Sequence, residues 1–485
     1  MSFDPALIKN ANFIDGTWVS ANSGETLGVT NPATGEPIGE VPNCGRDETK
    51  KAISAAHNAL KPWKKLTAEA RSEHMHKLCD AIMEQIDDLA ALLTTEMGKP
   101  LAEAKGEIAL GVKYIRFYAE EGKRVYGDTI PSPWADRRIL VTKEPVGVAG
   151  AITPWNFPNS MIARKLGAAL AAGCTIVIKP SEFTPYSALA FGVMAEKAGL
   201  PGGVINILTG NAAEIGAEMC ENPDLRKITF TGSTRVGKLL AAQAGQHMKK
   251  ISMELGGNAP FIVFDDADLD KAVAGAIASK FRNSGQTCVC ANRIYVQAGV
   301  YEAFAEKLKA AMDADLIPGN GLETGITQGP LINEAALEKV DSHVKDALEK
   351  GGSLKAGGSR VGSAGTFFAP TLIANATPDM RVAHEETFGP LAALFKFETE
   401  DEIVALANNT EYGLACYFYT SDLGRSFRMM EQLEYGLVGV NEGVITTEVA
   451  PFGGVKDSGI GNEGSKYGLD DYLNIKYSCI GGLGL

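Results

Sequence analysis

The chain has 485 residues, of which 45% are hydrophobic and 22% charged, and its formal net charge is -13. This length predicts roughly two to four domains. The acidic balance argues against a nucleic-acid partner, because a duplex binder needs a basic face.

Residues 46–120 are predicted to be helical, because their apolar residues recur at intervals of three and four. The residues before them lack a basic segment followed by an apolar stretch, so we expect no signal peptide. No segment approaches the roughly 18 consecutive apolar residues of a membrane span. We therefore expect a cytoplasmic enzyme without membrane contacts. Glycine and proline interrupt residues 126–133, and residues 137–145 are predicted to form a strand.

From residue 147 onward, short apolar strands alternate with helices. The predicted strands are 147–153, 174–180, 203–210 and 227–232, and the predicted helices are 161–173, 188–200, 212–220 and 233–245. Strands with near-continuous apolar residues are typical of sheets that helices cover on both faces. The series predicts a doubly wound parallel sheet, which binds ligands at the carboxyl ends of its strands.

A second α/β series follows the turn at residues 254–258. Its predicted strands are 259–266, 291–297, 367–373, 391–397, 415–420 and 436–441, with a helix near 301–313. The final segment, 470–482, alternates like a strand, and we expect it to close a sheet edge or to pair with another subunit.

Among eight scattered cysteines, Cys288 has unusual neighbours. Most isolated cysteines are small buried hydrophobic residues, but the flanking segment NSGQT (283–287) is small and polar, which favours an accessible, reactive thiol. None of the six histidines lies in a recognisable protease signature, although the fold could still bring one near the thiol. The Cys-x-Cys spacing does not match zinc ligands, so we expect no metal.

Seven short motifs occur in order along the chain: TPWNFP (153–158), KPSE (179–182), FTGSTRVG (230–237), MELGGNAP (253–260), GQTCVCANR (285–293), EETFGP (385–390) and PFGGVKDSG (451–459). Together they resemble the aldehyde dehydrogenase superfamily over essentially the whole chain. FRNSGQTCVCANR (281–293) and GNEGSKYGLDDYLNIKY (461–477) are similar to the succinate-semialdehyde dehydrogenase branch, with glutarate-semialdehyde dehydrogenases close by. The resemblance implies NAD(P)-dependent oxidation of succinate semialdehyde to succinate through a cysteine thioester. The alternatives are glutarate semialdehyde or a broader range of aldehydes.

The resemblance assigns three catalytic roles. Cys288 is the nucleophile, and the Asn156 amide with the Cys288 N–H stabilises the oxyanion. Glu254 is the general base for hydrolysis, and its apolar neighbours would raise its pKa. Without the resemblance, Asn156 would be taken as a turn residue and Glu254 as a surface residue or a helix cap.

The cofactor site lacks the usual G-x-G-x-x-G, because TPWNFP occupies the first turn. Gly232 and Ser233 instead open a helix whose N–H groups can hold a pyrophosphate. The segment GSTRVGKL (232–239) approaches a P-loop, but Leu239 stands where serine or threonine would bind magnesium. We therefore reject an ATPase.

Further cofactor contacts follow from the resemblance. Lys179 and Glu182 would meet the adenosine ribose, and the Glu182 carboxylate would disfavour a 2′-phosphate, so we expect NAD, with NADP as the alternative because Lys179 can pair with phosphate. Glu386 would hold the nicotinamide ribose beside Phe388. The remaining expected contacts are Trp155 and Leu255.

The substrate is expected to be an acidic semialdehyde. Arg164 follows Asn156 by eight residues and Arg282 precedes Cys288 by six, so both arginines can reach one pocket and clamp a carboxylate. Thr446 stands where the branch has a serine, and its extra methyl group would narrow the pocket.

Cys290 leaves two interpretations open: a disulfide with Cys288 that switches activity off under oxidation, or a small side chain in a tight loop. Other readings of the whole chain are an aminoaldehyde or aliphatic aldehyde dehydrogenase, a CoA-acylating relative, a catalytically silent protein of the same fold and a thiol hydrolase.

The predicted domains are an NAD-binding domain (1–125 and 146–255), a catalytic domain (256–440) and an oligomerisation segment (126–145 and 468–485). The first two are predicted to be doubly wound α/β domains, and the third to be β-rich. The resemblance of the third segment to subunit-bridging elements predicts a homo-tetramer or homo-dimer.

Overall fold

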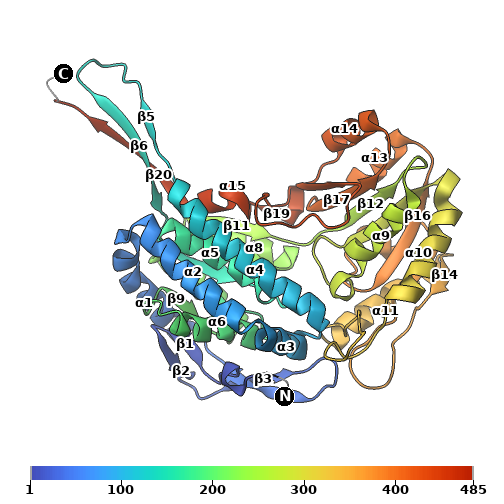
Figure 1. Cartoon of the computed structure of the whole chain (residues 1–485), viewed down its shortest axis with the longest axis horizontal. Coiled ribbons are helices and arrows are strands. Elements are labelled where there is room, and N and C mark those ends of the chain that lie inside the picture. The colour runs from blue at the N-terminus through green and yellow to red at the C-terminus, as the bar shows by residue number, and fades with distance from the viewer. Residues whose placement is uncertain (1–2, 483–485) are drawn as a thin grey trace.

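The computed structural model describes residues 3–482, and its first lobe is built on a sheet with the strand order β19-β11-β10-β7-β8-β9-β1-β2 (Figure 1). The strands are β1 (Asn12–Ile14), β2 (Thr17–Val19), β7 (Val148–Ile152), β8 (Thr175–Lys179), β9 (Ile205–Ile207), β10 (Leu225–Thr231), β11 (Lys250–Glu254) and β19 (Gly459–Ile460). Strands β7 to β11 are parallel. The predicted doubly wound sheet is confirmed.

Helices cover both faces of this sheet, because alternate strand residues face opposite sides. Ile176 and Ile178 pack with one set of helices, and Val177 between them packs with the other. The first set is α2 (Ala68–Glu84), α3 (Ile86–Met97), α4 (Leu101–Glu121), α5 (Ser160–Ala172) and α6 (Pro185–Lys197). The second is α1 (Arg46–Lys65), α7 (Ala212–Glu221) and α8 (Thr234–Gln246). The predicted helices of residues 46–120 are α1 to α4. Within residues 3–482, none of the helices has the length and apolar character that a membrane span requires.

The second lobe contains a sheet with the order β14-β15-β16-β13-β12-β17-β18, parallel except for β14. Its strands are β12 (Ala259–Val263), β13 (Ala291–Gln297), β14 (Ser353–Ala356), β15 (Thr371–Ala376), β16 (Leu391–Phe397), β17 (Ala415–Tyr419) and β18 (Leu437–Val440). Its helices are α9 (Leu269–Lys280), α10 (Tyr301–Asp315), α11 (Glu334–Glu349), α12 (Arg381–His384), α13 (Glu400–Asn408) and α14 (Leu423–Gln432). The strand predicted at 367–373 begins only at Thr371, because Pro370 has no N–H to donate.

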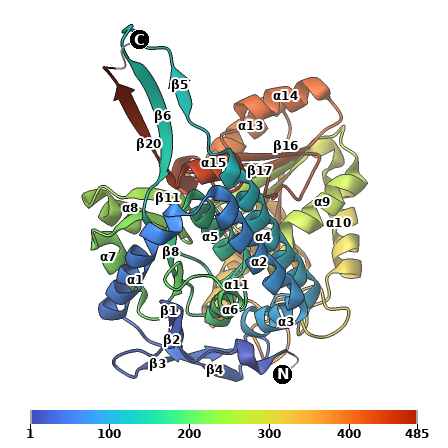
Figure 2. The same cartoon turned by 60° about the vertical axis from the view of Figure 1, so that its left-hand side comes forward.

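An antiparallel sheet of β5 (Asp128–Ile130), β6 (Arg138–Pro145) and β20 (Leu473–Ile480) projects from the first lobe as an arm (Figures 1 and 2). The predicted strand 470–482 starts at Leu473, because helix α15 (Ser465–Asp470) extends to residue 470. It closes an edge of β6. Ile475 and Tyr477 on β20 are 76% and 57% exposed. An exposed apolar surface of this kind is typical of an interface.

The three sheets fall largely within the ranges expected for three domains. The exception is β19, which lies outside all three ranges and pairs antiparallel with β11. A further hairpin, β3 (Thr26–Thr30) with β4 (Pro37–Pro42), was not predicted. The domain roles stay predictions.

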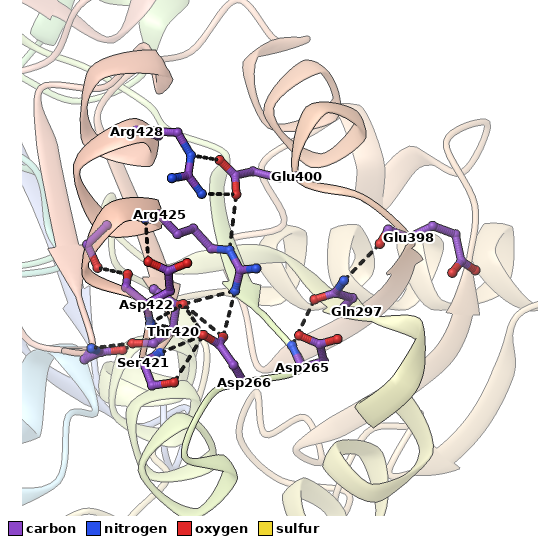
Figure 3. Close-up of polar contacts among 12 residues, drawn as sticks. Asp265, Asp266, Gln297, Glu398, Glu400, Thr420, Ser421, Asp422, Arg425 and Arg428 are labelled. Atoms are coloured by element: carbon purple, nitrogen blue, oxygen red, sulfur yellow. Dashed lines mark hydrogen bonds and ion pairs between the residues drawn. The ribbon is translucent and has the colours of Figure 1, made fainter.

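A polar cluster around Asp266 joins the ends of β12 and β17 in the second lobe (Figure 3). The Asp266 carboxylate accepts hydrogen bonds from Thr420 Oγ1 at 2.8 Å and Arg425 Nη1 at 2.8 Å. Arg425 Nε and Arg428 in turn contact Glu400 at the start of α13. The cluster therefore ties α13 and α14 to the carboxyl ends of β12 and β17.

We expect Asp266→Ala to lower the free energy of unfolding by about 2–4 kcal/mol, because it leaves Arg425 and Thr420 without their shared acceptor. Thermal and urea unfolding will measure the change. Asp265→Ala is the matched control, since Asp265 uses its backbone N–H, not its carboxylate, to bond Gln297. Equal loss in both variants would contradict the role of the cluster.

Candidate active site

The carboxyl ends of β7 and β10 meet where the strand order of the first sheet reverses. From β7 the chain proceeds outward through β8 and β9, and then returns to the other side of β7 for β10 and β11. Open α/β sheets bind ligands at such a point. A cavity of about 280 Å³ lies here, with Trp155, Gly232 and Ser233 from the first lobe and Glu386 and Phe388 from the second on its walls.

The loop before Cys288 has an unusual backbone conformation. Asn283, Ser284 and Gly285 have φ values of 52°, 53° and 74°, in the left-handed region that costs energy for residues with a Cβ. Ser284 Oγ donates to the Gly329 carbonyl at 2.8 Å, and a Cβ on Gly285 would lie 2.1 Å from the Gly389 carbonyl oxygen. Neighbouring segments thus impose the shape of the loop that presents Cys288.

The partly buried Cys288 side chain borders two cavities: the one described above and a second, narrow one of about 20 Å³. Burial raises the pKa of the thiol to about 12, and the Arg164 guanidinium opposes that rise. The thiol is therefore protonated near neutral pH, and its attack on a ligand requires removal of the proton.

Asn156 follows β7 and packs against the Cys288 loop. Its Nδ2 donates to the Gln286 carbonyl at 3.1 Å, and its buried Oδ1 has no hydrogen-bond partner within residues 3–482. Its carbonyl accepts hydrogen bonds from Lys99 Nζ at 2.9 Å and from Asn283 Nδ2 at 3.0 Å. One amide hydrogen of Asn156 therefore remains for a ligand beside Cys288.

Glu254 ends β11 and is buried at the same edge of the sheet. Neither carboxylate oxygen has a hydrogen-bond partner in the described part of the chain. Burial raises the pKa of Glu254 well above its usual value, and the Glu463 charge adds to this rise, whereas Lys165 and Arg164 oppose it. The expected rise is found, but charged as well as apolar neighbours cause it.

Sequence reasoning missed Lys165 and Glu463. Lys165 Nζ is fully buried, contacts the Glu463 carboxylate and donates to Thr231 Oγ1 at 2.7 Å. Arg164 Nη1 lies 3.7 Å from Glu463. One signal could have found the pair: Lys165 lies on a helix that is otherwise almost entirely apolar, and a buried lysine requires an anionic partner.

The narrow cavity brings together the three residues predicted to contact substrate. Arg164 from α5, Arg282 after α9 and Thr446 after β18 all line it beside Cys288. Arg164 packs between the rings of Tyr114 and Phe452, each 4.7 Å away, and its Nε and Nη1 have no hydrogen-bond partner among residues 3–482. Two guanidinium groups beside one thiol can bind an anionic group that extends away from the sulfur.

The larger cavity gathers six of the predicted cofactor contacts: Trp155, Gly232, Ser233, Leu255, Glu386 and Phe388. Trp155 and Phe388 form an edge-on pair at 5.5 Å, and Leu255 lies on the same wall. Glu386 accepts a hydrogen bond from the Gly257 N–H at 3.1 Å, and burial raises its pKa to about 7. Lys339, which was not predicted, lines this wall and donates to the Glu386 carbonyl at 2.5 Å.

Lys179 and Glu182 lie outside that cavity, one strand further along the same sheet edge. Lys179 ends β8 and is buried, and its Nζ is 3.4 Å from the half-exposed Glu182 carboxylate. Their contact with the adenosine ribose of a cofactor stays a prediction.

Cys290 is buried behind the Cys288 loop. Its sulfur lies 3.3 Å from Lys280 Nζ, and both Cys288 and Cys290 are free thiols. The predicted redox switch between the two cysteines stays a prediction.

Comparisons with known proteins agree over nearly the whole chain. A family model described as "Aldehyde dehydrogenase family" matches residues 18–478. The chain is 60% identical to a 3-sulfolactaldehyde dehydrogenase of Pseudomonas putida and 57% identical to a glutarate-semialdehyde dehydrogenase of Pseudomonas aeruginosa, covering 99% of each chain in both comparisons. It is 57% identical to the NADP(+) succinate-semialdehyde dehydrogenase of Escherichia coli, with the same coverage. A crystal structure of succinate-semialdehyde dehydrogenase from Burkholderia pseudomallei superposes with a TM-score of 0.98 at 57% identity, covering 99% of this chain and 100% of that one.

Proposed function

The chain belongs to the aldehyde dehydrogenase family, and we propose that it oxidises a short aldehyde with an anionic far end to the corresponding acid, using NAD(P). Succinate semialdehyde is the first candidate substrate and glutarate semialdehyde the second. One observation carries the proposal: Arg164, Arg282 and Thr446 line the same narrow cavity as Cys288. The names of the similar proteins support it, since each describes an aldehyde that also bears a carboxylate or a sulfonate.

In the first step, Cys288 loses its thiol proton to water, and the thiolate attacks the aldehyde carbon to form the oxyanion of a thiohemiacetal. The free hydrogen of the Asn156 amide and the Cys288 N–H then stabilise the oxyanion. Losing one donor of this kind typically raises the barrier by about 2.7–4 kcal/mol. The two arginines fix the far end of the substrate, so the carbonyl is presented to the sulfur in a limited range of directions.

The residues of the larger cavity fit a nicotinamide dinucleotide. The N-terminus of α8 supplies N–H donors for a pyrophosphate, and Ser233 caps that helix. Gly256 leaves room on the cavity wall, because a Cβ at this position would lie only 3.1 Å from the Glu386 carboxylate. Glu386 can accept hydrogen bonds from ribose hydroxyls. When bound, the nicotinamide supplies the acceptor for the hydride that leaves the thiohemiacetal.

In the last step, Glu254 takes a proton from water, and the water attacks the Cys288 thioester. The raised pKa makes Glu254 a stronger base than an exposed carboxylate once it has lost its own proton. Hydrolysis releases the acid and restores the thiol. A working base at this position disfavours transfer of the acyl group to CoA.

We further propose that the protein acts in the cytoplasm as a homo-dimer or homo-tetramer. The exposed apolar residues of the arm formed by β5, β6 and β20 support a subunit interface there.

Arg282→Ala and Arg164→Ala test the substrate assignment. Each is expected to raise KM for succinate semialdehyde about 10- to 100-fold, since each removes a charge-assisted contact with the carboxylate. Steady-state kinetics will compare that aldehyde with butanal, which has the same chain length and no charge. Equal effects on both aldehydes would refute the clamp, and a panel with glutarate semialdehyde and a sulfonated aldehyde will rank the acidic substrates.

We propose that NAD is preferred over NADP, because the Glu182 carboxylate would repel a 2′-phosphate. Lys179 Nζ lies 3.4 Å from the Glu182 carboxylate, so its charge is already paired with that group. Glu182→Ser should therefore shift the ratio of kcat/KM for NAD and NADP toward NADP by about 10-fold. Fluorescence titration with each cofactor gives the same ratio for binding alone. An unchanged ratio would contradict the role of Glu182.

Glu463→Gln tests the base. The negative Glu463 raises the pKa of Glu254, so its neutral replacement should lower that pKa. Glu254 then loses its proton at lower pH, and the acid limb of thioester hydrolysis should move to lower pH by roughly one unit. Stopped-flow measurement of hydrolysis after an acylation burst gives this limb. The control is Asp470→Asn, which removes an exposed carboxylate of the same segment. If the acid limb of the pH profile does not move in Glu463→Gln, Glu254 is not the base.

A further inference from the structure

One face of α4 and Lys99, which lies two residues before the helix begins at Leu101, contact both halves of the active site. Lys99, Glu103 and Glu107 are spaced four residues apart, which places the two glutamates one above the other on the helix. All three are outside every substrate, cofactor and catalytic assignment made above. They are nonetheless directed at the Asn156 turn and at the Cys288 loop.

Lys99 holds the Asn156 turn from two sides. Its ammonium group donates to the Asn156 carbonyl at 2.9 Å and lies 3.5 Å from the centre of the Phe157 ring. It is fully buried, and its charge is balanced by contact with the equally buried Glu107 carboxylate. A buried cation is tolerated only with such partners, so the position of its nitrogen is closely determined.

Glu107 and Glu103 extend this contact to neighbouring segments. The second oxygen of Glu107 accepts hydrogen bonds from the N–H groups of Asn159 and Ser160 at 2.9 and 3.1 Å, at the start of α5. Glu103 accepts a hydrogen bond from the Asn283 N–H at 2.8 Å, where the backbone enters its left-handed turn. α4 and the segment just before it thus contact the oxyanion turn, the start of the Arg164 helix and the nucleophile loop.

We propose that Lys99 is a positioning residue that sets the direction of the Asn156 amide toward the reacting oxygen; this rests on the proposed function. The Asn156 side chain bonds only to the Gln286 carbonyl within residues 3–482, so its direction depends on its own backbone. That backbone is fixed at its carbonyl by Lys99 and Asn283. Without the Lys99 donor, the turn can rotate, and the amide no longer faces the developing charge.

The test is a double-mutant cycle with Lys99→Met and Asn156→Ala. If Lys99 acts through Asn156, Lys99→Met should lower the single-turnover rate of NADH formation roughly 10- to 100-fold. The Lys99→Met/Asn156→Ala double variant should then be no slower than Asn156→Ala alone. The rate at which iodoacetamide alkylates Cys288 should stay within about 3-fold of the wild-type rate in all three variants, because the nucleophile itself is unchanged.

Glu107→Gln is a second test variant, and Glu96→Gln is its matched control. Each glutamate is buried and accepts two backbone N–H bonds at a helix start, Glu107 at α5 and Glu96 at α6. Only Glu107→Gln removes the negative charge that contacts Lys99, so only this variant should slow NADH formation. The rates of both variants are measured at saturating cofactor, and their melting temperatures are measured alongside. If Lys99→Met fails to fold, the cycle is run with Glu107→Gln instead.

Three results would overturn the inference. A Lys99→Met protein that melts earlier but reacts at the wild-type rate would have a stabilising role only. Multiplying effects in the double variant would mean that Lys99 acts independently of Asn156, with the proposed function intact. An Asn156→Ala protein of wild-type rate would overturn both the oxyanion assignment and this inference.

Discussion

The contact between the Asn156 turn and the Cys288 loop is the constraint on which the active site depends. Asn156 belongs to the first lobe and Cys288 to the second, and the hydrogen bonds between Asn156 and the carbonyl of Gln286 and the amide of Asn283 cross the boundary. Asn283 has a left-handed backbone, which costs energy, and its N–H donates a hydrogen bond to Glu103 of the first lobe. The lobes therefore cannot separate without changing the geometry around the sulfur, so access for ligands must come through the cavities on either side of it.

The substrate end of the active site is positively charged, although the protein as a whole is negatively charged. A chain with a net charge of -13 would repel an anionic substrate, yet it buries Arg164 beside the thiol between two aromatic rings. The rings shield the guanidinium from water without neutralising it. Glu463, 3.7 Å from Arg164, raises the pKa of Glu254, whereas Arg164, one of the two arginines assigned to the substrate, opposes that rise.

Much of this arrangement could be predicted from the sequence, because apolar periodicity and motif order depend on short segments. The strand and helix series of the first sheet and the meeting of Arg164, Arg282 and Thr446 follow from such segments. The pairing of Lys165 with Glu463 could not, because nearly 300 residues separate them. Positive φ at Asn283 and Ser284 is imposed by distant segments and leaves no local pattern. The N-terminal strands β1 and β2 have only three residues each, too few for a clear alternation.

The short strand β19 has a consequence for the order in which the molecule can be completed. It returns from the second lobe to pair with β11, opposite Met253 and Glu254, and Glu463 follows it by three residues. A nascent chain that has reached residue 458 can contain both large sheets, yet the strand bearing Glu254 is still an open edge and Lys165 lacks its anion. The site thus reaches its working electrostatic state only during the last stage of synthesis, after the nucleophile and both arginines have already been made.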